Sequence, residues 1–365
     1  MSKLIELADL GQAVWLDYIR RSFTRTGKLR ELVHQGVRGV TSNPTIFDKA
    51  IRESEDYDSE IQQLIDQGKS VSEIYETLVL TDIREAADEL AEVYQKTGGA
   101  DGFVSLEVDP TLANDTETTI SEAKRLFAAV DRANLMIKIP STPEGMPAIE
   151  AVTASGINVN ATLIFSIDQY EAVAEAYMAG LKERLATGKP IDRIASVASF
   201  FVSRVDTAVD LELGKIGQNH LQGKIAVDNA RLAQVRFLEL FSGERWGRLQ
   251  AAGAKVQRQL WASTGTKNPD YSDTLYVDNL IGPDTVNTLP PATLDAFLDH
   301  GQIATTLNED IEGAHHRMAE LARLGVDLNA ITEKLLHDGV GLFAQSFESL
   351  INSIKEKRSR FVVGK

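Results

Sequence analysis

The 365-residue sequence contains no cysteine, so disulfide bonds and thiolate chemistry are excluded, although this absence does not decide the redox compartment. Basic residues are also few: 38 Lys and Arg stand against 53 Asp and Glu, which gives a formal net charge of −15. Nucleic-acid binding needs clustered Lys and Arg along the phosphate backbone, so this balance argues against a nucleic-acid partner. A small phosphorylated ligand is still allowed, because it needs only one or two local cations.

Long uncharged runs are missing as well, and none approaches the ~18 residues that span a bilayer. The N-terminal residues lack a basic segment followed by an apolar one. No Gly-x-Gly-x-x-Gly or P-loop pattern follows a candidate strand, which leaves no case for a dinucleotide or a nucleoside triphosphate. The six histidines lie in candidate helices and loops, and none shares a helix face with enough further ligands for a metal site. We therefore expect a cytoplasmic protein without a membrane partner or a bound metal.

Short apolar-alternating segments, separated by helical stretches, recur along the whole chain, which is the pattern of βα units around a parallel sheet. Eight strands are expected, of which the last is poorly marked: 13–17, 37–43, 103–109, 134–139, 157–165, 194–202, 255–263 and 285–289. Helices are expected between them, over 27–34, 115–130, 144–155, 168–185 and 207–241. Because no repeat or linker is visible, we expect one domain over 1–365, with a helical insertion at about 45–96 and C-terminal helices at about 293–357. Gly68 and Ser70 mark the expected break within the insertion.

The two faces of these strands differ in polarity. In the third strand Ser105, Glu107 and Asp109 share one face, and in the fifth strand Asn158, Asn160 and Thr162 do so. An open doubly wound sheet covers both faces with helices, so its central strands should be apolar throughout. A closed (β/α)8 barrel instead packs one face on helices, lines its interior with the other and collects chemistry at the C-terminal ends of the strands. We therefore predict a (β/α)8 TIM barrel with additional helices.

Lys138 lies near the C-terminal end of the fourth strand, where Leu135, Ile137 and Ile139 form the opposite, apolar face. A lysine of this kind can be a solvated side chain on an edge strand. Inside a barrel, however, burial disfavours the charged ammonium, and a neutral amine attacks carbonyl carbons to form a Schiff base. The iminium then serves as the electron sink, so no cofactor is needed.

Schiff-base chemistry also needs groups that move protons and hold the substrate. Asp17 and Glu107 can supply the acid and base if burial raises their pKa values, although each can also be a simple ion-pair partner of Lys138. Arg204 follows the sixth strand and can bind a phosphate, although it can equally be a surface arginine at a helix end. The expected mouth of the barrel carries Asp17, Asn43, Glu107, Lys138, Asn160, Thr162, Ser199, Phe201 and Ser263.

Six motifs, in order along the chain, together resemble the transaldolase family of the class I aldolase superfamily, and the length resembles its long bacterial subtype. They are Val-Thr-Ser-Asn-Pro-Thr-Ile-Phe (40–47), Ser-Leu-Glu-Val (105–108), Asn-Leu-Met-Ile-Lys-Ile-Pro-Ser-Thr (134–142), Gly-Ile-Asn-Val-Asn-Ala-Thr-Leu-Ile-Phe-Ser (156–166), Ser-Phe-Phe-Val-Ser-Arg-Val-Asp (199–206) and Trp-Ala-Ser-Thr-Gly-Thr-Lys-Asn-Pro (261–269). The resemblance implies transfer of a dihydroxyacetone unit from fructose 6-phosphate to erythrose 4-phosphate in the pentose phosphate pathway. The products are sedoheptulose 7-phosphate and glyceraldehyde 3-phosphate, and the reaction also runs in reverse.

The resemblance also implies roles for single residues. Lys138 matches the Schiff-base lysine, Asp17 matches the acid/base acting on the hydroxyl of the bond to be broken, and Glu107 with Thr162 matches the pair that handles the catalytic water. Asn43 and Asn160 match the substrate-orienting amides. Ser199, Arg204 and Ser263 match phosphate contacts. Many members carry a second phosphate-binding arginine shortly after the serine equivalent to Ser263, where this chain offers only Lys267, which lacks the bidentate fork of arginine.

Two other functions stay open at this point. A fructose 6-phosphate aldolase of the same superfamily releases free dihydroxyacetone, and an aldolase of that kind tends to carry Tyr where this chain has Phe201, so we favour the transferase. A non-catalytic sugar-phosphate sensor on a degenerate barrel is disfavoured by the intact set of Lys138, Asp17 and Glu107. The sequence is compatible with a monomer or a homodimer.

Overall fold

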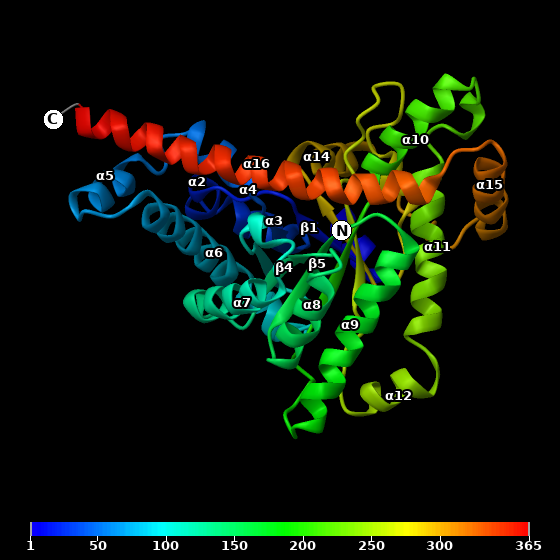
Figure 1. The fold of residues 1–365 in the computed structure, drawn as a ribbon, viewed down its shortest axis with the longest axis horizontal. Coiled ribbons are helices and arrows are strands. Elements are labelled where there is room, and N and C mark those ends of the chain that lie inside the picture. Colours follow the sequence, from blue (N-terminus) through cyan, green and yellow to red (C-terminus); the bar gives the residue numbers. More distant parts are fainter. Residues whose placement is uncertain (1, 364–365) are drawn as a thin grey trace.

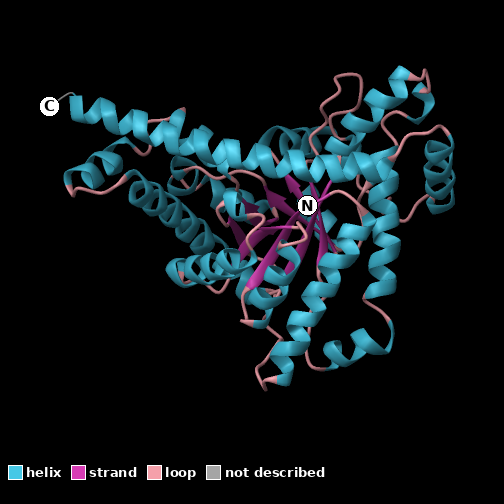
Figure 2. Ribbon diagram, in the orientation of Figure 1, coloured by secondary structure: helices cyan, strands magenta, loops and turns pink. Residues whose placement is uncertain are grey.

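A computed structural model describes residues 2–363, so Met1 and positions 364–365 of the expected domain lie outside the described residues. Eight parallel strands close into a barrel in chain order, at the centre of the molecule and surrounded by helices (Figure 2). This confirms the expected (β/α)8 barrel. The strands are β1 (Gln12–Leu16), β2 (Val37–Thr41), β3 (Phe103–Glu107), β4 (Leu135–Pro140), β5 (Asn158–Ile164), β6 (Ser196–Phe201), β7 (Arg258–Ala262) and β8 (Thr285–Leu289).

The barrel closes where β1 pairs with β8 in one unbroken register, from Gln12 opposite Thr285 to Leu16 opposite Leu289. All eight expected strands are present, and several end one or two residues earlier than expected. Asp17, Asn43 and Ser263 therefore lie just beyond the C-terminal ends of β1, β2 and β7, and not within the strands. At Ser263 the backbone has φ +56°, a left-handed conformation that turns the chain out of the sheet.

Side chains fill the opposite, N-terminal end of the barrel, as is usual for this fold. Arg258 at the start of β7 forms an ion pair with Asp101, which precedes β3 on the far side of the barrel (2.9 Å). The indole N–H of the fully buried Trp15 donates to the same carboxylate (3.0 Å). Buried ion-pair and hydrogen-bond contacts thus occupy this end of the barrel.

The helices between the strands are mostly those expected from the sequence. They are α1 (Lys3–Asp9), α2 (Arg21–Arg25), α3 (Lys28–Gln35), α4 (Pro44–Arg52), α5 (Asp58–Asp66), α6 (Val71–Lys96), α7 (Thr116–Val130), α8 (Gly145–Ala154), α9 (Ile167–Ala186), α10 (Ser203–Lys215), α11 (Ile225–Leu240), α12 (Gly243–Ala251), α13 (Leu275–Asn279), α14 (Pro291–His300), α15 (Ile311–Arg323) and α16 (Leu328–Val363), with short 3-10 turns at Pro110–Leu112 and Asn219–Leu221. Helices α1, α2, α12 and α13 were not expected. Within residues 2–363 no helix is both long and apolar enough to cross a membrane.

The expected break near Gly68 and Ser70 is confirmed, and its physical cause is visible. Gly68 ends α5 with φ +77°, a conformation that costs glycine little. Ser70 caps α6: its hydroxyl accepts from the Glu73 N–H, and the Glu73 carboxylate accepts from the Ser70 N–H. Two local signals in the sequence therefore fix this boundary.

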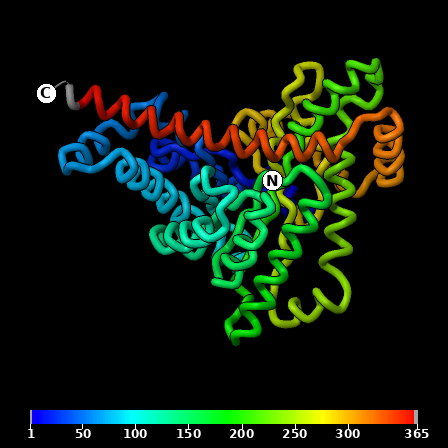
Figure 3. Tube along the Cα trace, viewed as in Figure 1, coloured from blue at the N-terminus to red at the C-terminus, as the bar shows by residue number. Residues whose placement is uncertain are grey.

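The 36-residue helix α16 runs along one whole side of the molecule, from the α15 end past α4 to the α5 end (Figure 1). Segments from the two ends of the sequence thus lie side by side (Figure 3). The buried Asp48 of α4 joins them, because its carboxylate accepts hydrogen bonds from Ser349 (2.9 Å) and Ser353 (2.7 Å) of α16. These contacts fix α16 across the end of the barrel that carries Lys138.

Candidate active site

Lys138 occupies the middle of three neighbouring strands, where it lies in register with Glu107 of β3 and Asn160 of β5. Only 5% of its surface is exposed. Its Nζ donates to the carbonyl oxygen of Ser42 (3.2 Å) and lies 3.5 Å from Glu107 Oε2. The ring of Phe343, from α16, lies over the same ammonium, 5.7 Å away from its centre. The amine is thus enclosed by strand ends below and by α16 above.

Asp17 follows β1 and faces the same site. The hydroxyl of Thr41, at the end of β2, donates to its Oδ1 (2.6 Å), and Thr41 also shares a hydrogen bond with Thr288 of β8 (2.6 Å). Burial raises the pKa of Asp17, while the Thr41 hydrogen bond and the positive charges of Lys138 and Lys267 oppose this rise. A carboxyl group tuned in this way can accept a proton from a substrate hydroxyl and return it.

Glu107 is buried at the end of β3, and burial raises its pKa, opposed by the charge of Lys138. Among the described residues 2–363, its Oε2 has no hydrogen-bond partner beyond the ion pair with that lysine. The hydroxyl of the fully buried Thr162, on β5, has no protein partner either. Because buried polar atoms need partners, these two groups are suited to hold a water molecule that takes part in a reaction.

Amide side chains near Lys138 are held in fixed orientations. Asn43 caps α4, since its Oδ1 accepts from the Ile46 N–H (3.0 Å), which leaves its amide N–H groups for a ligand. Asn160 donates to the Ser105 hydroxyl (3.0 Å) and accepts from the Ser199 hydroxyl (2.6 Å). The Ser199 hydroxyl therefore donates its hydrogen bond to Asn160 inside the barrel, and this bond orients the Asn160 amide.

A cavity of about 600 Å³ opens at the C-terminal end of the barrel. It brings together eight of the eleven residues expected in the site: Asp17, Asn43, Lys138, Ser199, Phe201, Arg204, Ser263 and Lys267. Glu107, Asn160 and Thr162 do not line it but form the buried layer beside Lys138. We call this space the mouth cavity.

Besides Lys138, three cations line the mouth cavity: Arg204 at the start of α10, Lys267 after β7 and Lys49 on α4. None of them forms an ion pair with a carboxylate among residues 2–363. The Arg204 guanidinium lies over the ring of Phe201, 5.4 Å from its centre, and burial lowers its pKa from the usual value. Unpaired cations at the mouth of an acidic protein suit an anionic group on a ligand.

Thr41, Thr288, Lys49 and Phe343 also line the cavity, and the sequence reasoning did not include them in the site. The period-2 pattern did place Thr41 on the same face as Asn43, so this signal could have identified it. Lys49 and Phe343 lie on helices, where a strand pattern carries no information. Residues 2–363 contain no group of three or more His, Asp or Glu side chains that could hold a metal ion.

Comparison with known proteins gives one consistent result. The family model described as Transaldolase/Fructose-6-phosphate aldolase matches residues 14–354. A transaldolase of Parafrankia sp. (strain EAN1pec) is 52% identical over 363 residues, which cover 98% of both chains. Transaldolases of Thermobifida fusca (strain YX) and Trichodesmium erythraeum (strain IMS101) are 50% and 47% identical, covering 98% and 97% of both chains respectively. These similarities confirm the resemblance inferred from the six motifs.

Proposed function

Because the chain belongs to the transaldolase/fructose-6-phosphate aldolase family and functions as a transaldolase, we propose that Lys138 carries the dihydroxyacetone unit as a Schiff base. The observation that supports this role best is the position of its amine, which is 5% exposed and lies 3.5 Å from Glu107. Transfer of a proton from Lys138 to Glu107 leaves a neutral amine and a neutral acid, so no unpaired charge remains buried. The neutral amine then attacks the C2 carbonyl carbon of a ketose phosphate.

Glu107 and Thr162 handle the water of this step. The carbonyl oxygen takes up two protons and leaves C2 as water, while the carbon–nitrogen double bond forms. Within residues 2–363 both groups have a buried oxygen atom without a hydrogen-bond partner, which supports this role; Glu107 contacts Lys138, and Thr162 lies two residues beyond Asn160, the register partner of Lys138. At the end of the reaction the same two groups direct a water molecule to the iminium carbon.

Asp17 breaks and remakes the carbon–carbon bond. Asp17 accepts the proton of the C4 hydroxyl, and the C3–C4 bond breaks. The electron pair of that bond passes into the iminium. The aldose phosphate leaves, and the dihydroxyacetone unit stays on Lys138 as an enamine. When a second aldose phosphate binds, the steps run in reverse. The raised pKa that burial gives Asp17 suits both directions of proton transfer.

The remaining residues of the mouth cavity hold the substrate. Asn43 and Asn160 orient its hydroxyl groups, and Ser199 fixes Asn160. Arg204, Ser263 and Lys267 bind the phosphate. This role is supported by the finding that neither Arg204 nor Lys267 has an ion-pair partner within residues 2–363. Phe201 places an aromatic ring, and no hydroxyl, beside these groups.

The substrates we assign are fructose 6-phosphate or sedoheptulose 7-phosphate as donor, and erythrose 4-phosphate or glyceraldehyde 3-phosphate as acceptor. We assign the activity to the cytoplasm, because charged sugar phosphates do not cross a bilayer freely. A coupled assay with fructose 6-phosphate tests the assignment. Sedoheptulose 7-phosphate should form only when erythrose 4-phosphate is present, and equal turnover without acceptor, with release of free dihydroxyacetone, would contradict it.

A further inference from the structure

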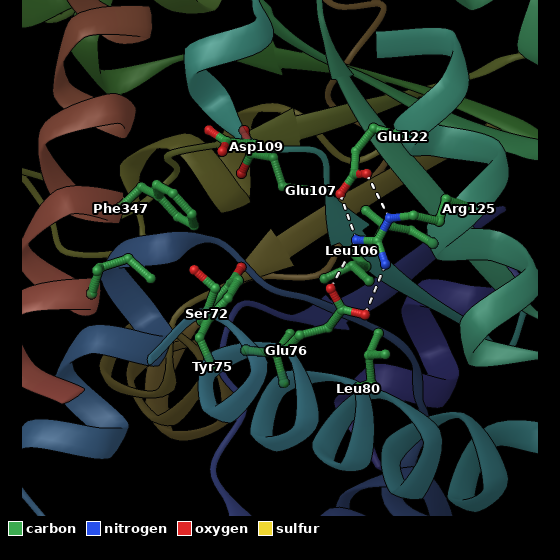
Figure 4. Close-up of a pocket in the computed structure, with 13 residues that line it drawn as sticks. Ser72, Tyr75, Glu76, Leu80, Leu106, Glu107, Asp109, Glu122, Arg125 and Phe347 are labelled. Atoms are coloured by element: carbon green, nitrogen blue, oxygen red, sulfur yellow. Dashed lines mark hydrogen bonds and ion pairs between the residues drawn. The ribbon is translucent and has the colours of Figure 1, made fainter. Parts of the chain in front are cut away.

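A second cavity, of about 360 Å³, lies outside the barrel between α6, α7 and α16, against the end of β3 (Figure 4). Glu107 lines this cavity, whereas Lys138 and Asp17 line the mouth cavity. The ion pair of Glu107 with Lys138, 3.5 Å between Oε2 and Nζ, therefore links a residue of one lining to a residue of the other. We call the second space the side cavity.

The outer wall of the side cavity is polar and held rigidly. Arg125 of α7 makes two hydrogen bonds to Glu76 of α6 (2.8 and 2.9 Å) and two to Glu122 (2.8 and 2.9 Å), as Figure 4 shows. These three side chains are partly exposed to solvent, and Ser72, also on the wall, is exposed. The side cavity thus joins the protein surface to a buried catalytic carboxyl group without passing the mouth.

The inner wall offers a line of polar groups toward Glu107. Asp109 lies two residues further along the chain, and Tyr75 projects from α6 opposite the ring of Phe347 (5.3 Å between ring centres). In the part of the chain that the structure describes, Glu107 Oε2 has no hydrogen-bond partner apart from its ion pair with Lys138. A space of this size with polar groups at both ends accommodates several water molecules.

The chemistry of the active site moves a water molecule away from Lys138 and back again in each reaction cycle. Schiff-base formation joins the Lys138 ammonium and a ketone into an iminium and one water, and hydrolysis consumes one water in return. In the mouth cavity this water shares its path with the sugar phosphate and with the ring of Phe343, whose centre lies 5.7 Å from the Lys138 nitrogen. We propose that the side cavity is the path by which the catalytic water leaves and re-enters, passing Glu107. The inference rests on the proposed roles of Lys138 and Glu107.

The absence of cysteine makes a sharp test possible. The variant Ser72→Cys carries a single thiol on the wall of the side cavity, which benzyl methanethiosulfonate blocks and a thiol reductant reopens in the same folded protein. Ser121→Cys, on the exposed surface of α7 away from the cavity lining, is the matched control. Leu126→Trp narrows the cavity from the α7 side without any reagent.

The readout is the loss of oxygen-18 from C2 of labelled fructose 6-phosphate, measured without acceptor and compared with the rate of group transfer. Each round of Schiff-base formation and reversal exchanges this oxygen with the water that reaches Glu107. We expect the ratio of label loss to transfer to fall several-fold in blocked Ser72→Cys, to recover after reduction, to fall likewise in Leu126→Trp, and to stay unchanged in blocked Ser121→Cys.

Equal label loss in blocked and unblocked Ser72→Cys would overturn the water route while leaving the Schiff base intact. No label loss in the unmodified enzyme would likewise overturn the route, whereas absence of a borohydride-trapped donor on Lys138, despite group transfer, would instead overturn the proposed role of Lys138. The two failures are therefore distinguishable.

Discussion

Asp17 is the residue on which carbon–carbon bond cleavage depends in this account, so we expect Asp17→Asn to abolish most of the transfer. An amide cannot accept the C4 hydroxyl proton, and loss of a general base typically lowers kcat by about 10²–10⁴-fold. Borohydride should still trap the donor on Lys138, because Schiff-base formation precedes this step. Stopped assays of transfer and trapping check both outcomes, and a kcat near that of the unaltered enzyme would remove Asp17 from the mechanism.

Thr41 is a useful partner for that experiment, since its hydroxyl donates to Asp17 (2.6 Å) and lowers the pKa that burial raises. Thr41→Val keeps the Asp17 carboxyl group but removes the hydrogen bond that lowers its pKa. Thr288, whose hydroxyl lies 2.6 Å from that of Thr41, is left unchanged. We expect the acidic limb of the kcat profile to move to higher pH, whereas a limb that stays in place would show that Asp17 does not set it.

Arg204→Ala tests the phosphate site. Loss of one charge-assisted hydrogen bond costs about 1.5–3 kcal/mol, so KM for fructose 6-phosphate should rise roughly 10- to 100-fold with little change in kcat. Unphosphorylated fructose is the control substrate, and its much weaker turnover should not change. An unaltered KM for the phosphorylated donor would exclude Arg204 from phosphate binding.

Among the elements, α16 places the ring of Phe343 over Lys138, and we propose that this ring limits the access of water to the amine. Phe343→Leu keeps much of the packing but uncovers part of the site, so water should hydrolyse the dihydroxyacetone intermediate more often before an acceptor arrives. We expect free dihydroxyacetone to appear several-fold faster in the absence of acceptor. Leu342→Ala, a neighbouring and half-exposed position, is the control, and equal release from both variants would contradict the role of α16.

The strands could be predicted from the sequence because each strand encodes its two faces locally, whereas the position of α16 could not. Its path depends on Asp48, which bonds to serines 301 and 305 residues away in the sequence. No local pattern reports a contact at that separation. Helix was therefore predicted up to about residue 357, but Phe343 could not be assigned to the site.

At the scale of the whole molecule, closure of the barrel was predictable because polar residues recur at the ends of successive strands. That pattern identified the residues around Lys138, including the three in the buried layer behind the mouth cavity. The side cavity was not predictable, since its walls come from α6, α7 and α16 as well as from β3. Only the packing of these elements shows that Glu107 lines a second space while it contacts Lys138.

Stability of the whole protein should depend on Asp206, a buried carboxyl group of α10 that accepts from the Ala226 N–H (2.7 Å) and the Tyr276 hydroxyl (3.0 Å). Burial raises its pKa to about 7, against about 3.9 in the unfolded chain. Between these values the folded state binds the extra proton, so the free energy of unfolding falls as pH rises from about 4 to about 7.

Asp206→Asn removes this titration. We compare the free energy of unfolding of this variant with that of the unaltered protein. The value for the variant minus the value for the unaltered protein should rise by about 2–4 kcal/mol between about pH 4 and about pH 8. Urea unfolding at several pH values measures the difference. If the difference between the two proteins were the same at every pH, Asp206 would not retain its proton in the folded state.

The most direct test of the central claim is to reduce the enzyme with borohydride in the presence of fructose 6-phosphate and to locate the adduct by peptide mass. The account predicts one reduced dihydroxyacetone unit, on the peptide that contains Lys138, and none in Lys138→Ala of native fold. An adduct on another lysine, or no adduct while transfer proceeds, would contradict it.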